Sequence, residues 1–123
     1  KADSRPEEIK VSSMDEKFLE RTQKIVSEHM SDQDFNIEKL GELVGMSRSQ
    51  LHRKLTALVN LSPTAFVRSL RLKSAASLIR QKSGTISEIA FEVGFNNLSY
   101  FAKSFKEQYG VLPSGYLDPS GKE

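Results

Sequence analysis

A short segment occurs twice in the chain, and this repeat constrains the fold more than any other feature. Residues 37–45 (IEKLGELVG) align without a gap on residues 86–94 (ISEIAFEVG), at a period of 49 residues. Each copy has apolar residues at helical spacing, a small residue in its middle (Gly41, Ala90) and a glycine at its end. A small residue lets two helices cross closely, and a terminal glycine supplies the backbone turn. The repeat predicts two helix-turn-helix units.

A second helix is expected after each copy of the repeat. Ser47 suits the cap of a helix that places Leu51 on its inward face. The corresponding helix of the second copy runs from about Asn97 to Tyr109, with Phe101 facing inward. The second copy has one residue more between its turn glycine and this inward position.

One long helix is expected to connect the two units. Ser62 can cap it, and Pro63 takes the first helical position, where its missing N–H costs nothing. The helix should run to about Lys82, and roughly 20 residues at about 1.5 Å each span roughly 30 Å. Successive major-groove faces of a duplex lie about 34 Å apart. A helix of this length can therefore hold both units on one face of a duplex within one chain.

No segment alternates apolar and polar residues long enough to form a strand, so the sequence predicts an all-α fold. We expect the first helix to be capped by Asp15, and the end of the domain to dock through Tyr116 and Leu117. The expected organisation is an arm or linker (residues 1–14), a first helix-turn-helix subdomain (15–62), a linker helix (63–82), a second helix-turn-helix subdomain (83–117) and a disordered tail (118–123).

Charge is distributed unevenly along the chain. Residues 1–45 carry seven basic and eleven acidic side chains, a net charge of −4, whereas residues 46–123 carry eleven basic and five acidic ones, a net charge of +6. A stretch as basic as residues 46–123 is either a solvated surface with few acids or the electrostatic footprint of a site that binds a polyanion. Residues 46–87 contain no acid and eight basic residues: Arg48, Arg53, Lys54, Arg68, Arg71, Lys73, Arg80 and Lys82.

The composition argues against several functional classes. The chain has no cysteine, which removes disulfides, thiolate zinc sites and thiol nucleophiles, and its two histidines form no metal-site pattern. No acidic pair lies beside a nucleophile or a glycine-rich phosphate loop. No apolar run approaches the length of a membrane span. We therefore expect no enzyme in this chain, no cofactor and no metal, and a cytoplasmic location.

In a helix-turn-helix, the early outward side chains of the second helix reach base edges in the major groove. Arg53 can form two parallel hydrogen bonds with guanine, and His52 can donate to or accept from a base edge. The second unit has fewer long polar groups, so we expect it to read more of the backbone and the shape of the duplex. The predicted base-contacting residues are Ser49, His52, Arg53, Asn97, Ser99, Ala102 and Lys103, and the predicted phosphate-contacting residues are Ser47, Arg48, Lys54, Lys73 and Lys106.

Two blocks of the sequence together form the pattern of a known family. One is residues 45–55 (GMSRSQLHRKL), and the other contains the pairs 89–90 (IA) and 94–95 (GF), residues 99–101 (SYF) and residues 113–116 (PSGY). With this pattern the chain resembles, between about Phe18 and Leu117, the DNA-binding domain of the AraC/XylS family of bacterial transcription regulators. The pattern also includes these residues: Pro63, Phe66, Arg71, Leu72, Ala75, Phe105, Lys106 and Gly110. The resemblance implies seven helices in two subdomains with a connecting helix, and sequence-specific binding of promoter or operator DNA. Arg71 matches an arginine with a structural role, pairing with Glu88 or Glu92, rather than a DNA contact.

Residues 9–19 (IKVSSMDEKFL) look like the join found where this domain is the output module of a hybrid two-component sensor. That resemblance makes the chain a fragment whose upstream regulatory domains receive a phosphoryl signal. It implies that the full-length protein can carry a histidine kinase, can be membrane-anchored, and acts on the nucleoid, where RNA polymerase can be a further partner. We expect the full-length protein to dimerise through its N-terminal part, because this chain shows no heptad pattern or large apolar stripe that predicts a dimer interface. The isolated domain is expected to be a monomer. The alternative is a helical protein-interaction module without DNA binding, whose affinity would lack a steep salt dependence.

The aromatic residues of the second unit are interpreted as core residues rather than as base-stacking residues. Their spacing along the expected helix favours burial for at least three of them. These residues are Phe95, Tyr100, Phe101 and Phe105.

Overall fold

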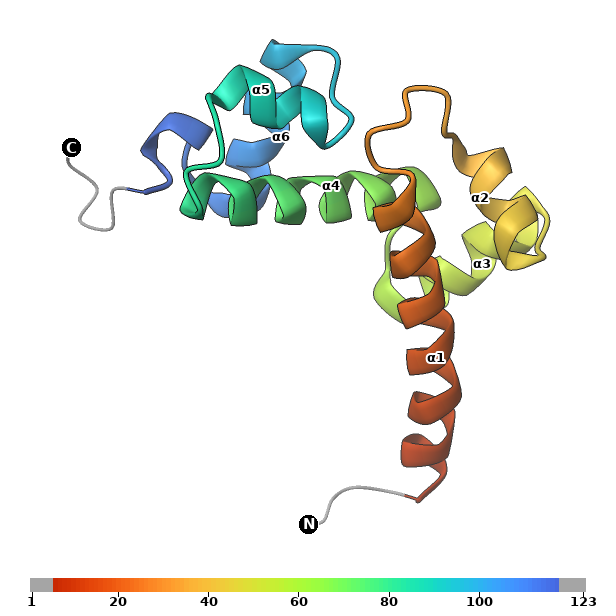
Figure 1. Ribbon diagram of the computed structural model, residues 1–123. Coiled ribbons are helices and arrows are strands. Elements are labelled where there is room, and N and C mark those ends of the chain that lie inside the picture. Colours follow the sequence, from red (N-terminus) through yellow and green to blue (C-terminus); the bar gives the residue numbers. More distant parts are fainter. Residues whose placement is uncertain (1–5, 118–123) are drawn as a thin grey trace.

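The computed structural model describes the backbone of residues 6–117 and the side chains of residues 13–117. Within this range the chain forms six α-helices, one 3₁₀ helix and no strand, which confirms the all-α class (Figure 1). The seventh helix implied by the resemblance is the 3₁₀ helix. The elements are α1 (Pro6–Glu28), α2 (Ile37–Val44), α3 (Arg48–Val59), α4 (Pro63–Arg80), α5 (Ile86–Glu92), α6 (Leu98–Tyr109) and η1 (Pro113–Gly115).

The first helix-turn-helix unit forms where the sequence predicts it. The side chain of Asn36 caps α2 by accepting a hydrogen bond from the Lys39 N–H at 2.8 Å, and Gly45 ends the helix at φ 78°. Ser47 and Gln50 then form a reciprocal capping box at the start of α3. The need for a small residue in α2 is also confirmed, because a Cβ on Gly41 would lie 2.6 Å from the Met46 carbonyl oxygen.

The second unit repeats this plan. Thr85 and Glu88 form a capping box at the start of α5, and the Asn97 side chain caps α6. The helices α3 and α6 both contain 12 residues. The buried residues of the two helices correspond at a spacing of fifty positions. Phe101 and Phe105 of α6 take the places that Leu51 and Leu55 hold in α3. The repeat therefore extends through the second helix, with one residue added in the turn.

The helix α4 joins the two units and contributes to the core of each. It contacts α1 and α3 at one end and α5 and α6 at the other. At 18 residues it is about 27 Å long. Leu70 and Leu78 are only partly buried and pack against the core. The buried residues of α4 are Pro63, Phe66, Val67, Leu72, Ala75, Ala76 and Ile79.

The first helix begins earlier than expected. Pro6 starts α1 because its fixed φ suits the first helical position, so residues 6–14 of the predicted arm are helical. Asp15 therefore lies inside the helix and does not cap it, which corrects that expectation. Farther along α1, Arg21 donates to the carbonyl of Leu43 at 3.1 Å and so satisfies a free acceptor at the end of α2.

The end of the domain docks as predicted, with one exception. Tyr116 packs edge-on against Phe105, with ring centroids 5.3 Å apart, and accepts a hydrogen bond from Arg80 at 2.7 Å. Leu117 was also expected to dock but is 42% exposed. The predicted tail, residues 118–123, lies outside the described residues. None of the helices in residues 6–117 is both long and apolar enough to cross a membrane.

Candidate nucleic-acid interface

The outward face of α3 carries the predicted base-contacting residues of the first unit. Ser49, His52 and Arg53 are exposed, whereas Leu51 and Leu55 on the opposite face are completely buried. This arrangement follows from the helical period, because positions i, i+3 and i+4 share one face. Their exposure makes these three side chains accessible to a ligand.

The outward face of α6 carries a stripe of the same spacing. Ser99, Lys103 and Lys106 are exposed, and Ala102 is half-buried. Each of the first two lies fifty positions after its counterpart in α3, so Ser99 corresponds to Ser49 and Lys103 to Arg53. The two helices thus present equivalent faces that differ in the length and charge of their side chains.

An open groove of about 490 Å³ lies beside the α3 stripe. It lies between the first turns of α3 and of α4, so that α4 forms one wall of the surface next to the stripe. His52, Arg53 and Thr64 are among the residues that line it, together with Ile37, Arg48, Ser49, Ser62 and Pro63.

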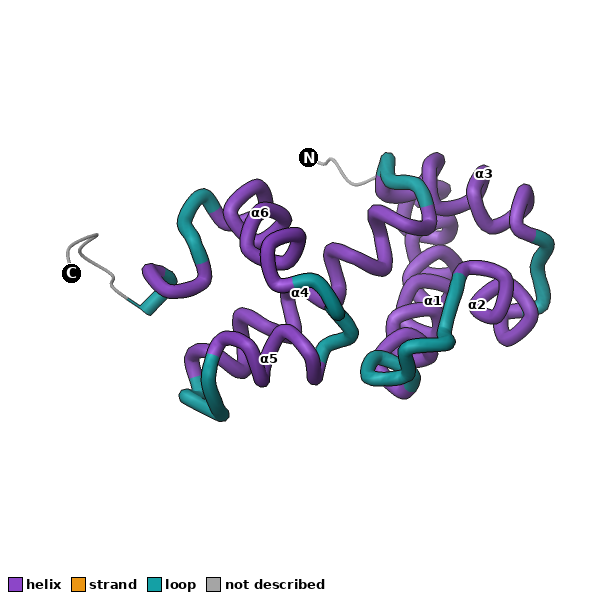
Figure 2. The backbone as a smooth tube through the Cα atoms, turned by 90° about the horizontal axis from the view of Figure 1, so that it is seen from above, coloured by secondary structure: helices purple, strands orange, loops and turns teal. Residues whose placement is uncertain are grey.

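A second, smaller cavity of about 190 Å³ lies between α4 and the start of the second unit. Thr64 lines both cavities, so they are adjacent along α4. At its rim Arg68 donates to the Tyr100 hydroxyl in the first turn of α6 at 3.0 Å. The starts of α3 and α6 therefore border the same stretch of α4, and Figure 2 shows both helices toward one side of the molecule.

Three of the predicted contact residues also stabilise the domain itself. The Ser47 hydroxyl and the Asn97 amide oxygen accept hydrogen bonds from the backbone as caps of α3 and α6. Lys54 lies 3.7 Å from the Asp15 carboxylate and 5.2 Å from the centre of the Phe18 ring, both on α1. Lys54 thus joins α3 to α1, and this contact directs its ammonium group away from the α3 stripe.

Lys73 is placed apart from the other predicted contacts. It is exposed, but it follows Arg68 by five residues, which is about 140° around the helix. It follows Thr64 by nine residues, which brings it to about the opposite face of α4. The side of α4 that borders the two cavities is therefore not the side that carries Lys73.

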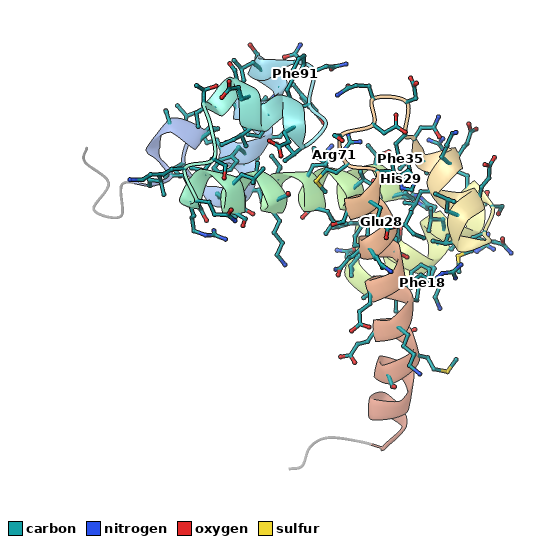
Figure 3. The ribbon with its side chains drawn as sticks, viewed as in Figure 1. Phe18, Glu28, His29, Phe35, Arg71 and Phe91 are labelled. Atoms are coloured by element: carbon teal, nitrogen blue, oxygen red, sulfur yellow. The ribbon has the colours of Figure 1, made fainter. Side chains whose placement is uncertain are left out.

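Arg71 has a structural position but not the expected partner. It lies between the two units (Figure 3), where its Nη1 donates to the Gly94 carbonyl at 3.4 Å. The expected partners Glu88 and Glu92 are not its contacts, and Glu88 instead accepts from the Thr85 N–H. Burial lowers the pKa of the Arg71 guanidinium because desolvation penalises its charge.

Gly94 brings the two units into direct contact. A Cβ at this position would lie 2.5 Å from the Met30 carbonyl oxygen of the first unit and 2.9 Å from Arg71 Cζ. Gly94 also has φ +101°, which side chains rarely adopt. The repeat predicted a turn glycine here, but not its second role at the junction between the units.

Three residues of this surface were missed from the sequence. Thr64 and Arg68 gave no motif signal beyond the acid-free block, and Tyr100 was interpreted as a core residue. Tyr100 is in fact 47% exposed, while the other three aromatic residues of that set are buried as expected. Tyr100 directly precedes the inward-facing Phe101, and the helical period turns it outward.

The charged residues of α3 and α4 are all basic, whereas α2 and α5 carry exposed acids. No acid occurs in α3 or α4, and the charged side chains that line the two cavities are all basic. The acids of the first helices of each unit, Glu38, Glu42, Glu88 and Glu92, are all exposed. Figure 3 shows Phe91, also on α5, at the top of the second unit, where Phe91, Glu88 and Glu92 line a cavity that Ser31 and Gln33 of the first unit also border. The basic side chains of α3 and α4 attract an anion to the surface around the two cavities.

Two helix-turn-helix units, each with an exposed second helix and both anchored on one long helix, define a bipartite helix-turn-helix domain. Residues 40–118 match the family model described as "Helix-turn-helix domain". A solved structure described as a "probable AraC family transcriptional regulator", from Rhodopseudomonas palustris, is similar with a TM-score of 0.69 at 26% identity, covering 83% of this chain and 95% of that one. The chain belongs to the helix-turn-helix domain family, in its AraC type.

Two curated relatives are similar over most of this chain. Histidine kinase P4 of Formosa agariphila is 37% identical over 111 residues, which are 90% of this chain and 8% of that protein. The HTH-type transcriptional regulator MtrA of Neisseria gonorrhoeae is 38% identical over 92 residues, 75% of this chain and 31% of that protein. The chain thus spans less than a third of the length of either relative.

Proposed function

We propose that this domain binds double-stranded DNA in a sequence-specific manner and regulates bacterial transcription. The observation that carries the proposal is the pair of equivalent outward stripes on α3 and α6, which border one acid-free stretch of α4. We call α3 and α6 the recognition helices, because each enters a major groove in this proposal. The helix α4, about 27 Å long, spaces these two helices for successive major grooves of one duplex.

The two helices have different tasks in this proposal. In α3, Arg53 and His52 read base edges, because both are exposed and carry hydrogen-bonding groups on long side chains. In α6, Ser99, Ala102 and Lys103 read less sequence, and Lys106 contacts a phosphate. Arg48 and Ser47 contact phosphates at the start of α3. Asn97 uses its amide oxygen as a cap, so only its NH₂ group is available for a base.

The domain is further proposed to be the output module of a two-component signalling protein. Support comes from the similarity to a region that makes up 8% of a relative named as a histidine kinase. The kinase, the other upstream domains, dimerisation of the full-length protein, contact with RNA polymerase and a cytoplasmic location are predictions for the whole protein. This domain carries no catalytic role in the proposal.

Selection of bound sequences from random duplexes, followed by titration at several salt concentrations, tests the function. We expect a recovered motif and an affinity that falls steeply with salt, since basic residues release counterions from the duplex. Arg53→Ala should cost about 1–3 kcal/mol on the selected site and relax the preference at one base pair. Lys24→Ala, which removes an exposed charge from α1, is the matched control. It should change neither the affinity for the selected site nor the preference at any base pair. No enrichment and a flat salt response would favour the protein-interaction module instead.

A further inference from the structure

The small cavity between α4 and α6 has a lining that the recognition helices do not explain. Thr64, Arg68 and Arg71 line it from α4 at positions i, i+4 and i+7, so they form one stripe along the helix. Tyr100 and Asn96 line it from the second unit. The remaining residues of the lining are Val67, Gly94 and Phe95, so it contains two guanidinium groups and no carboxylate.

The positive charge of this cavity lacks a counter-charge. Arg68 donates to a neutral tyrosine hydroxyl, and Arg71 donates to a backbone carbonyl at the long distance of 3.4 Å. The Nε of Arg71 is buried and has no hydrogen-bond partner among the described residues. A buried or half-buried cation without a partner is unfavourable, and an anion placed between two such groups would relieve both.

The position of the cavity indicates which kind of anion would bind in it. Thr64 belongs also to the groove beside α3, and Tyr100 lies in the first turn of α6. The cavity therefore lies between the two recognition helices, on the side of α4 that they share. A duplex that meets both helices with its major grooves passes its sugar-phosphate backbone over the point between them.

We propose that this cavity binds one backbone phosphate of the duplex, between the two major-groove contacts. Arg68 donates to the phosphate, Arg71 adds the second positive charge behind it, and the Tyr100 hydroxyl positions the Arg68 guanidinium. This site rests on the proposed function, and it adds a contact to DNA that belongs to neither recognition helix. It fixes the register of the duplex relative to both helices, because phosphate contacts position a protein without reading sequence.

A comparison of Arg68→Gln with Arg80→Gln tests the site on the selected duplex. Both arginines lie on α4 and donate to a tyrosine hydroxyl, so the two variants lose the same charge and the same kind of hydrogen bond at different places. We expect Arg68→Gln to weaken binding about 10- to 100-fold and to reduce the slope of log affinity against log salt by about 0.9. Arg80→Gln should leave the slope unchanged.

A scan of neutral methylphosphonate substitutions along the duplex identifies the phosphate. One substitution between the two groove contacts should weaken the wild type, and the same substitution should have no further effect on Arg68→Gln. Tyr100→Phe keeps the charge and should retain the full salt slope while weakening binding less than Arg68→Gln does. Circular dichroism of each variant establishes that it is folded.

Three outcomes separate the possible failures. The phosphate site would be overturned if Arg68→Gln and Arg80→Gln had equal salt slopes. It would also be overturned if every methylphosphonate substitution that weakens the wild type weakened Arg68→Gln to the same extent. Inorganic phosphate at constant ionic strength could also stabilise the free domain in a manner that depends on Arg68. If the methylphosphonate scan were flat in that case, the cavity would bind a free anion, and the proposed site for a DNA phosphate would be overturned. A wild type that binds no duplex would instead contradict the proposed function.

Discussion

Replacing Gly94 with alanine tests how closely the two units are joined. The new Cβ would lie 2.5 Å from the Met30 carbonyl oxygen, and a backbone atom cannot rotate away as a side chain can. A non-glycine residue at a left-handed φ costs about 1–2 kcal/mol, and overpacking adds about 1–3 kcal/mol. The expected loss in the free energy of unfolding is therefore about 2–5 kcal/mol, a large part of the stability of a small domain.

Gly110→Ala is the matched control for this prediction. Gly110 has a similar left-handed φ of +83°, but a Cβ there would meet nothing within 4 Å. Its expected cost is the backbone strain alone, about 1–2 kcal/mol. Urea unfolding followed by circular dichroism measures both values, with the slope of the transition as a check on two-state behaviour. Equal losses for the two variants would refute the close contact between the units at Gly94.

Three further predictions follow from the same geometry. Ser47→Ala removes the capping box of α3 and should lower the free energy of unfolding by about 0.5–2 kcal/mol in the same assay. Lys54→Ala should lower stability by about 1 kcal/mol, because it loses a partly buried ion pair with Asp15 and a contact with the Phe18 ring, and it should weaken DNA binding less than Lys106→Ala does in a titration with random duplex. The isolated domain should sediment as a monomer, and a stable dimer at micromolar concentration would contradict that expectation.

Local sequence patterns predicted the helices and most of their ends. Ser47 and Ser62 cap helices where the sequence places them, because a cap depends on residues only three positions apart. Asp15 failed as a cap because the chain before it, starting at Pro6, is also helical. The outward stripe of α3 was predicted for the same reason as the caps, since it needs the helical period alone.

Contacts between distant residues were not predictable in this way. Lys54 pairs with a residue 39 positions earlier, so its basic character alone suggested a phosphate contact. Arg71 was expected to pair with an acid, yet its contact is a carbonyl 23 positions away at the junction of the units. Both cases concern charged side chains whose partners within the domain are set by how the helices pack, which no local pattern records.

The two units are equivalent in geometry but unequal in chemistry, and this difference suggests how they divide the task. Where α3 has Arg53, whose planar group can form two parallel hydrogen bonds, α6 has Lys103, a point charge that fixes the geometry of a base contact less strictly. A weakly selective second unit still contributes to affinity, because α4 holds it near the duplex once α3 is bound. Its contact with DNA then does not lose the translational and rotational freedom of a separate binding event. The continuity of α4 matters for this effect, since each residue in it advances the second unit by about 1.5 Å and turns it by about 100°. The number of residues between Ser62 and Gln81 therefore determines whether both helices can meet the same duplex.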